Sequence, residues 1–136
     1  MTSQLNVDTI VDKAGSGGTN VKVGNTSTYV GENSGITQNL VQSLIKAWGF
    51  TDGSATLIDT LNVSSGTDNG TGDYTYTYTS NMNNQYYGGA PVAKDSGNYI
   101  ATFYEIAASN TRIVNRSDST AAHDNGNCWG VWGDLA

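Results

Sequence analysis

Three residues near the C-terminus belong to the types that perform covalent catalysis. His123 is the only histidine, Asp124 follows it directly, and Cys128 is the only cysteine. A cysteine nucleophile requires a base and a group that orients that base, so the parts of a Cys-His-Asp arrangement are formally present. The spacing between them has no specificity for such a site.

The surroundings of these residues favour structural roles. His123 and Asp124 lie in the polar stretch 122–126, which predicts an exposed turn, and Cys128 precedes an apolar segment in which a buried cysteine acts as a small hydrophobic residue. Metal binding by His123 and Asp124 needs ligands from elsewhere, such as the two other copies of His123 if this residue lay on a trimer axis. We predict no catalytic residue, no cofactor and no metal site within one chain.

A glycosidase pair of carboxylates also lacks support. Glu32 and Glu105 are the only glutamates, and aspartates such as Asp52 and Asp124 lie in Asp-Gly or Asp-Asn turns, where the carboxylate serves the backbone geometry. A depolymerase of surface polysaccharide would need a longer chain. The protein is predicted not to be an enzyme.

Aromatic rings are the remaining candidates for recognition, since sugar rings stack on exposed aromatic faces. Tyr86 and Tyr87 lie in an Asn- and Gly-rich segment. Trp129 and Trp132 are predicted on opposite faces of the last strand, so that one of them points away from the core. These four residues are candidate contacts to a host-surface glycan, and the alternative, which we favour, is that the rings fill a core between subunits.

The composition defines the scaffold that must hold these residues. The chain has 136 residues, of which 37% are hydrophobic and 13% are charged, with 17 glycines and one proline. That length suits one domain, or a small domain with an ordered arm. Eight tyrosines and three tryptophans supply the large side chains that disordered polar segments lack. We predict a folded, mainly β protein.

The charge of the chain and its lack of a long apolar run argue against two classes of partner, nucleic acid and membranes. The formal net charge is −6, and six scattered Lys and Arg residues form no basic stripe, so nucleic acid is not expected as a partner. No apolar run approaches the roughly 18 to 20 residues that cross a bilayer, so membrane insertion is not expected. We expect the chain to be synthesised in the cytoplasm. A single cysteine forms no intrachain disulfide, so stability must come from packing and from subunit association.

The first 35 residues are predicted to form an extended β arm. Alternation over Ser3–Asp12 indicates a strand, and the Gly-rich stretch 14–18 that follows indicates a loop. Val21 and Val23 indicate a second short extended piece, and the polar segment 25–35 indicates a surface connection.

One helix is predicted, over Ile36–Trp48, because apolar residues recur there at helical spacing and Gly49 follows as a stop. Within it the spacing of four, three and four residues is that of a coiled-coil seam, and we name its members as candidate oligomerisation residues: Thr37, Val41, Leu44 and Trp48. The alternative, slightly favoured, is a helix packed once on the domain core.

The remainder of the chain, within a domain over 36–136 that this helix leads, is predicted to be an antiparallel β-sandwich. Asp73–Thr79 is the clearest strand, with three tyrosines on one face and three threonines on the other. Ser64–Gly72 is predicted as turn residues. The other predicted strands are Ala55–Val63, Tyr99–Ile106, Thr111–Asn115 and Cys128–Trp132, with Asn- and Gly-rich loops between them.

Several of these segments resemble the virion proteins of tailed bacteriophages. Ser3–Ile10 followed by a Gly-rich turn is similar to the start of many tail-fibre proteins of marine and cyanobacterial viruses. Asn39–Trp48, Leu61–Tyr78 and Asn81–Tyr87 are similar to a recurrent C-terminal fibre domain, in which a Lys-Ala-Trp strand precedes a hairpin. The final four residues, 133–136, are also similar to that family's ending.

The resemblance implies a virion component, usually a homotrimer, that decorates a particle or touches the host surface. Typical fibres carry a long shaft, and here only residues 23–36 separate the arm from the end domain. We therefore expect a short trimeric fibre or fibre tip, attached to other virion proteins through residues 1–35. The alternatives are a capsid decoration protein and a lectin-like module that binds a host glycan.

Overall fold

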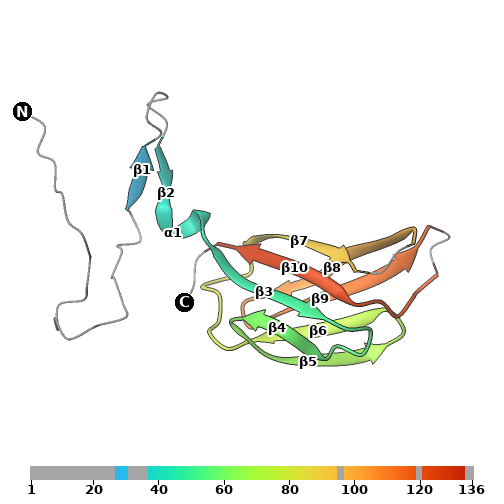
Figure 1. The fold of residues 1–136 in the computed structure, drawn as a ribbon. Coiled ribbons are helices and arrows are strands. Elements are labelled where there is room, and N and C mark those ends of the chain that lie inside the picture. Colours follow the sequence, from blue (N-terminus) through green and yellow to red (C-terminus); the bar gives the residue numbers. More distant parts are fainter. Residues whose placement is uncertain (1–26, 31–36, 95–96, 119–120, 134–136) are drawn as a thin grey trace, which may run out of the picture. The chain divides into compact units, whose positions relative to one another are not determined.

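A computed structural model describes residues 27–30, 37–94, 97–118 and 121–133 of the chain (Figure 1). The chain divides into two compact units, residues 1–41 and 42–136. In the first unit, β1 (Thr28–Val30) pairs antiparallel with β2 (Thr37–Asn39). The predicted surface connection is therefore wrong for Thr28–Val30, which forms a strand. The predicted strand Ser3–Asp12, the Gly-rich loop and the piece at Val21 and Val23 lie outside the described residues.

The predicted helix over Ile36–Trp48 is wrong except for four residues. The helix α1 covers only Leu40–Ser43, and Ile45–Thr51 forms the strand β3. Residues of β3 alternate between buried and partly exposed positions, and both edges of the strand pair with neighbours, β10 and β4. Strand β10 pairs along most of β3 and β4 pairs with residues 48–51, and these pairings override a local helical spacing. Among the described residues, no helix has the length and apolar character needed to span a membrane.

The second unit consists of two four-stranded antiparallel sheets that pack face to face, which confirms the predicted sandwich (Figure 1). One sheet has the order β4-β3-β10-β7 and the other β5-β6-β9-β8. The remaining strands are β4 (Leu57–Leu61), β5 (Val63–Gly70), β6 (Asp73–Tyr78), β7 (Gly88–Ala93), β8 (Tyr99–Ala107), β9 (Asn110–Ser117) and β10 (Asn127–Trp132).

Two of these strands differ from the sequence prediction. The segment predicted as turns over Ser64–Gly72 is mostly strand β5, and the turn to β6 needs only Thr71 and Gly72. Strand β7 lies where only Asn- and Gly-rich loop was expected, and its sequence GGAPVA has little β-propensity. Its pairing with β10 and its place at the sheet edge allow Pro91, which has no backbone N–H to donate.

Asn62 carries the chain from one sheet to the other, so the predicted single strand Ala55–Val63 is in fact divided. The backbone of Asn62 has φ of 58°, in the left-handed region that Asn tolerates better than most residues. Its side-chain amide donates to the carbonyl oxygens of Lys46 (3.1 Å) and Ser80 (3.0 Å), and its Oδ1 accepts the Ser80 N–H (2.7 Å). The corner is thus held by side-chain hydrogen bonds to two other segments.

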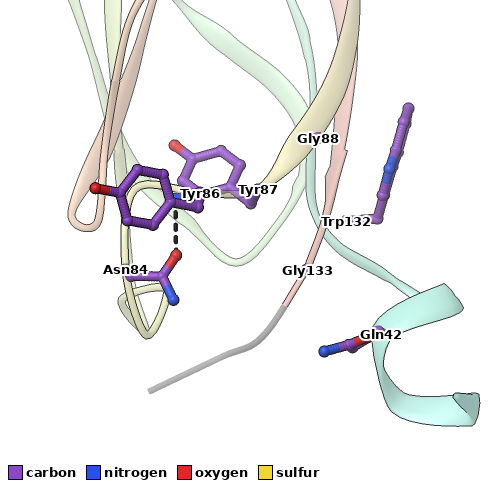
Figure 2. Close-up of a pocket in the computed structure, with 7 residues that line it drawn as sticks. All are labelled: Gln42, Asn84, Tyr86, Tyr87, Gly88, Trp132 and Gly133. Carbon is purple, nitrogen blue, oxygen red and sulfur yellow. Dashed lines mark hydrogen bonds between the residues drawn. The ribbon is translucent and has the colours of Figure 1, made fainter.

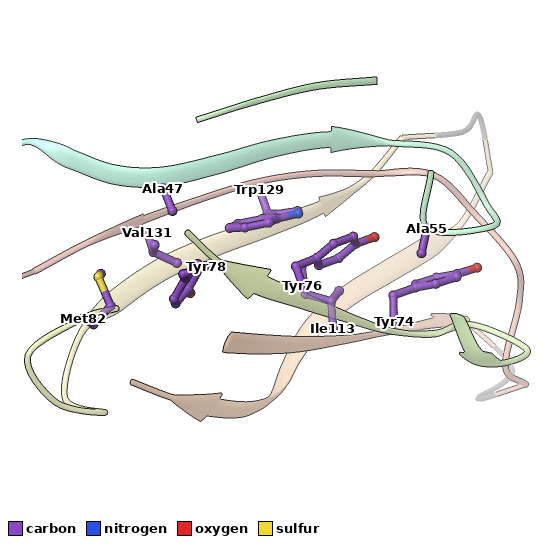
Figure 3. Packing of buried hydrophobic residues seen from close by; sticks show 9 residues of the cluster. All are labelled: Ala47, Ala55, Tyr74, Tyr76, Tyr78, Met82, Ile113, Trp129 and Val131. Atoms are coloured by element: carbon purple, nitrogen blue, oxygen red, sulfur yellow. The ribbon is translucent and has the colours of Figure 1, made fainter. Parts of the chain in front are cut away.

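The core lies between the sheets and is built mainly from aromatic rings (Figure 3). Tyr74, Tyr76 and Tyr78 all point inward from β6, as their alternation predicts, and at most 4% of each is exposed. Trp129 meets them from the opposite sheet, with its ring centroid 5.2 Å from that of Tyr76. The indole lies over Gly49, where an added Cβ would come within 2.8 Å of the ring.

A polar network occupies part of this core. The Tyr76 hydroxyl is 2.8 Å from Thr51 Oγ1 and accepts a hydrogen bond from Asn127 Nδ2 at 3.2 Å. All three residues are completely buried. The hydroxyl of a buried tyrosine needs partners of this kind, so the network ties β3, β6 and β10 together at one place.

Candidate functional site

A small pocket at one end of the sandwich is lined by the loop between β6 and β7, by the adjoining ends of β7 and β10 in one sheet, and by Gln42 of α1 (Figure 2). Its volume is about 250 Å³. We call it the Tyr86–Trp132 pocket, and its lining residues are Gln42, Asn84, Tyr86, Tyr87, Gly88, Trp132 and Gly133. Three of the four aromatic residues predicted to contact a glycan therefore line one pocket.

Tyr86 is the most exposed ring of the pocket, with 85% of the residue accessible to solvent. It lies in the loop before β7, and its backbone N–H donates to Asn84 Oδ1 at 2.7 Å. This bond closes an Asx turn, in which an asparagine side chain caps the backbone two residues ahead. The loop therefore has a defined backbone at Tyr86, while the ring itself projects into solvent.

Tyr87 has a structural role in the pocket wall. Its ring is half-buried and packs against the core, and its hydroxyl lies 2.9 Å from that of Tyr78. The hydroxyl also lies within hydrogen-bond distance of two carbonyl oxygens, of Ala107 (3.0 Å) and Asn110 (3.1 Å). Burial raises the pKa of Tyr87 above its ordinary value of 10.0, so the hydroxyl stays protonated at neutral pH.

The two tryptophans of β10 separate as predicted, one inward and one outward. Trp129 is 2% exposed and belongs to the core, whereas Trp132 is 43% exposed. The Trp132 ring lies beside Gly88 of the paired strand, where an added Cβ would come within 2.5 Å of its Nε1. Figure 2 shows Tyr86 and Trp132 on opposite sides of Gly88 and Gly133. Only Gly88 leaves room for the indole in this position.

The lining chemistry of the pocket is aromatic and neutral polar. None of its seven residues carries a charge, and the side-chain amides of Gln42 and Asn84 supply both hydrogen-bond donors and acceptors. The volume is below the roughly 300 to 1,000 Å³ of pockets that enclose drug-sized ligands. Rings that can stack, beside amides that bond hydroxyl groups, suit a neutral ligand about the size of one sugar ring.

His123, Asp124 and Cys128 are placed in separate structural roles. His123 is exposed, as predicted, and its ring packs against Tyr99 at a centroid distance of 4.6 Å. The Asp124 carboxylate accepts the Gly72 N–H (2.7 Å) and the Tyr74 hydroxyl (3.2 Å), so it holds the β5–β6 turn. Cys128 was predicted to be buried and is exposed, because its neighbours Asn127 and Trp129 take the inward positions of β10.

The aspartates of the Asp-Gly and Asp-Asn turns serve the backbone, as predicted. Asp52 Oδ1 accepts the N–H groups of Ser54 and Thr56, both at 2.9 Å, and Asp68 Oδ1 accepts that of Gly70. These backbone bonds lower the pKa of Asp52 below its ordinary value of 3.8. Among the described residues, no three His, Cys, Asp or Glu side chains gather closely enough to hold a metal ion.

The four candidate oligomerisation residues do not share a helix. Thr37 is in β2, Val41 is in α1, Leu44 follows α1, and Trp48 is in β3. Because the continuous helix is absent over these described positions, their spacing no longer defines a coiled-coil seam. Leu44 is 55% exposed and Trp48 is partly exposed, and both belong to the second unit.

Reasoning from sequence missed Gln42 and Asn84 as pocket residues. Gln42 lay inside the wrongly predicted helix and had no signal of its own. Asn84 stands two residues before Tyr86, the spacing of an Asx turn, and this signal was available. The role of Gly88 depends on Trp132, which is 44 positions away in the chain, so it required the tertiary structure.

The comparisons with known proteins identify no relative of the chain. It matches no protein-family model, no curated protein and no solved structure. The fold and the pocket define a small antiparallel β-sandwich with an aromatic-lined recess.

Proposed function

We propose that the chain is a structural component of a tailed-phage virion, a short fibre or fibre-tip protein that projects a β knob. The observation that supports this is the order of elements at the start of the sandwich. The resemblance implies a Lys-Ala-Trp strand followed by a hairpin, and Lys46–Trp48 lies in β3 while β5 and β6 form the hairpin. Periodicity alone predicted a helix at the same place.

In this proposal the knob is residues 42–136, and the protein acts as a homotrimer that binds other virion proteins through residues 1–35. The protein performs no catalysis and is located in the virion. A capsid decoration protein is the alternative within the structural class, because it needs the same arm and the same compact knob.

Copy number in purified particles tests the proposal. Quantitative mass spectrometry of virions should return about a dozen copies for a fibre and hundreds for a decoration protein. Absence of the chain from purified particles would overturn both. Deleting residues 1–24 should leave a folded sandwich that no longer joins particles, and normal incorporation of the truncated chain would place attachment elsewhere.

A second candidate function is recognition of a host-surface glycan by the Tyr86–Trp132 pocket. It is favoured because Tyr86 and Trp132 both line one uncharged recess, on opposite sides of Gly88 and Gly133. A stacked ring contributes about 0.5 to 1.5 kcal/mol, so each should change affinity by about 2- to 12-fold. Such binding is weak for one chain and would depend on several copies acting together.

This second candidate is tested with neutral oligosaccharides on a glycan array, followed by calorimetric titration of any hit. Tyr86→Ala should weaken binding without affecting stability, because this ring is exposed. Tyr104→Ala is the matched control, since Tyr104 is also exposed, at 64%, on a strand outside the pocket. Tyr87→Ala is unsuitable because its ring and hydroxyl support the core. Equal binding by wild type and Tyr86→Ala would exclude the pocket.

A further inference from the structure

The dipeptide Asn-Gly, in which asparagine is most prone to spontaneous deamidation, occurs twice in the chain. It is present at Asn69-Gly70 and at Asn125-Gly126. Glycine has no Cβ, so the preceding asparagine side chain reaches its backbone nitrogen more easily than that of any other residue. The two sites have the same local chemistry, and only their surroundings in the fold distinguish them.

Deamidation of asparagine needs no reactant other than water. The backbone nitrogen of the following glycine loses its proton and attacks the side-chain Cγ, so that a C–N bond forms. The bond between Cγ and Nδ2 breaks, and Nδ2 takes up the proton and leaves as ammonia. Water then opens the resulting succinimide ring at either carbonyl group, which leaves aspartate or isoaspartate. The reaction therefore requires room for the ring to close and access for water.

The fold closes the second of the two sites. Asn125, Gly126 and Asn127 are all buried, and Asn125 is only 2% exposed. The Gly126 carbonyl oxygen accepts the Lys94 N–H at 2.8 Å, and an added Cβ on Gly126 would come within 2.5 Å of the Thr51 carbonyl oxygen. A backbone packed this closely does not turn to bring its nitrogen onto the neighbouring side chain, and burial keeps water away.

The first site lies at the exposed end of a hairpin. Asn69 is near the end of β5, and all residues of the segment 67–71 are exposed. In the register of β5 with β6, the residues on either side of Asn69 have an opposite residue and Asn69 has none, so it is the extra residue of a β-bulge. An added Cβ on Gly70 would meet no atom within 4 Å. The succinimide ring has room to close here.

Hydrogen bonds across the hairpin hold the Asn69 amide in place. Its Nδ2 donates to Thr75 Oγ1 at 2.8 Å and to Asp73 Oδ1 at 3.2 Å. The Gly70 N–H, whose nitrogen makes the attack, donates to Asp68 Oδ1 at 2.9 Å. Both acceptors of Nδ2 lie on β6, so the leaving group is held toward the opposite strand and must be released before the ring closes. The native hairpin therefore slows a reaction that its exposure permits.

We propose that Asn69 is a site of spontaneous deamidation whose rate is set by the hydrogen bonds of its side chain to Thr75 and Asp73, and that Asn125 is protected by burial. The exposure of Asn69 and the open space at Gly70 support the site, and the two hydrogen bonds of Nδ2 support the control of its rate. None of these residues lines the Tyr86–Trp132 pocket, and the chemistry does not depend on the virion role.

Deamidation would add a negative charge beside a carboxylate that is already ionised. Asp73 Oδ1 accepts hydrogen bonds from Asn69 Nδ2 and from Arg112 Nε, the latter at 2.8 Å. The ion pair with Arg112 keeps Asp73 charged at neutral pH. The aspartate product has no N–H to donate to Asp73 and repels it. Isoaspartate in addition lengthens the backbone by one carbon, so either product should weaken the β5–β6 hairpin.

Peptide mapping of native protein incubated at mildly alkaline pH tests the proposal. Replacement of the amide by a carboxyl group gives a mass shift that fragmentation assigns to one asparagine, and digestion at acidic pH prevents further reaction. The peptide with Asn69 should acquire this shift with time, and the peptide with Asn125 should not. In guanidinium chloride both peptides should react, because the unfolded chain protects neither.

Thr75→Val measures the contribution of one hydrogen bond to the rate. It removes the acceptor Oγ1 and keeps the β-branched shape, so deamidation at Asn69 should become about 2- to 12-fold faster, the factor that one net hydrogen bond corresponds to. Thr77→Val is the matched control, because it makes the same change on the same outward face of β6, farther from the turn. It should react as wild type does. Thermal unfolding checks that both variants are folded during the incubation.

The effect on stability is tested with Asn69→Asp, which has the side chain of the aspartate product. Its folding equilibrium constant from urea unfolding should be about 2- to 12-fold lower than that of wild type, because a hydrogen bond is replaced by repulsion. Asn84→Asp is the matched control, because it gains the same charge at an exposed position and its Oδ1 still accepts the Tyr86 N–H. The control should be as stable as wild type.

Three results would overturn the proposal. Reaction at Asn125 as fast as at Asn69 in the native protein would show that burial gives no protection. A native protein unreacted at Asn69, when the unfolded chain has reacted fully, would show that the hairpin closes the site. Equal rates in Thr75→Val and Thr77→Val would show that the hydrogen bond does not set the rate. Equal stability of the two aspartate variants would overturn the predicted weakening of the hairpin. None of these results bears on copy number in virions or on glycan binding.

Discussion

Replacing Tyr76 with Phe isolates the contribution of the buried polar network to stability. The substitution removes one oxygen and leaves the ring that packs on Trp129 at 5.2 Å. Thr51 Oγ1 keeps its contacts with the Asn127 backbone, at 3.3 and 3.4 Å. Asn127 Nδ2, in contrast, loses the hydroxyl to which it donates at 3.2 Å. The variant therefore leaves a completely buried amide group without its hydrogen bond.

The expected loss of stability is about 1 to 3 kcal/mol, the cost of a buried polar group left unsatisfied. For a unit of this size, each kcal/mol lowers the melting temperature by about 4 to 8 °C. A loss of 2 kcal/mol would then lower it by about 8 to 16 °C. The ring packing is retained, so the fluorescence of Trp129 in the folded state should not change.

Urea unfolding followed by far-UV circular dichroism measures the free energy of unfolding, with an unchanged m-value expected. Tyr86→Phe is the matched control, because it removes the same oxygen from a residue that is 85% exposed, and it should stay within about 0.5 kcal/mol of wild type. A Tyr76→Phe variant as stable as this control would refute the reasoning, since the three buried residues would then gain nothing from the hydroxyl.

Three further predictions concern the sandwich. Gly49→Ala should destabilise it by about 1 to 3 kcal/mol, because the new methyl group would lie 2.8 Å from the Trp129 ring; Gly130→Ala, whose Cβ would meet nothing closer than 4.0 Å, is the control, and thermal melts of dilute protein compare them. Burial raises the pKa of Tyr76 and Tyr78 above the ordinary value of 10.0, so stability should be unaffected by these groups below pH 10 and fall above it by about 1.4 kcal/mol per pH unit for each. The tyrosinate absorbance that Tyr76→Phe removes from the wild-type spectrum should then appear together with unfolding, and its gradual appearance in the folded protein would contradict this. A hydrogen bond from Arg112 lowers the pKa of Asp73 below 3.8, so Asp73→Asn should cost about 0.5 to 1 kcal/mol at neutral pH; the difference should begin to shrink as pH falls below 3.8 and should be lost only below the lowered pKa of the folded state, so urea titrations at pH 7 and pH 3 should show a smaller difference at pH 3.

The sequence predicted correctly those elements whose local pattern agreed with their tertiary environment. Strand β6 alternates tyrosine and threonine, and the two faces it predicts are the buried and the outward faces of the structure. Strands β8, β9 and β10 lie where their β-branched and aromatic residues predicted them. Trp129 and Trp132 are three positions apart, and an extended strand must send them to opposite sides.

The wrong predictions share a physical reason. Over Ile45–Thr51 the apolar residues are dense enough to fit both the helical period of 3.6 residues and the strand period of two. Pairing with β10 and β4 makes this segment a strand. Strand β7 has a poor β sequence and exists because β10 offers it a partner. Cys128 points outward because Asn127 and Trp129 on either side of it point inward. Which side of β10 is the inward one depends on the sheet that packs against it. In each case at least one of the decisive contacts comes from a residue more than 30 positions away in the chain.

The candidate sites divide in the same way. The residue types of the Tyr86–Trp132 pocket were evident from sequence, because exposed aromatic rings in Gly- and Asn-rich segments are unusual. Their convergence was not, since it requires the end of β10 to lie beside the start of β7. The exposed apolar residues around β3 could not be placed from sequence, because Leu44, Ile45 and Trp48 were assigned to a helix. The sequence by itself determined a mainly β protein with an aromatic core, since these features follow from composition and local alternation. Its one predicted helix was wrong for all but four residues. Only the tertiary structure decided which strands are neighbours, and therefore which rings meet in a pocket and which lie together on an open face, because strand pairing is a non-local choice that local spacing does not encode.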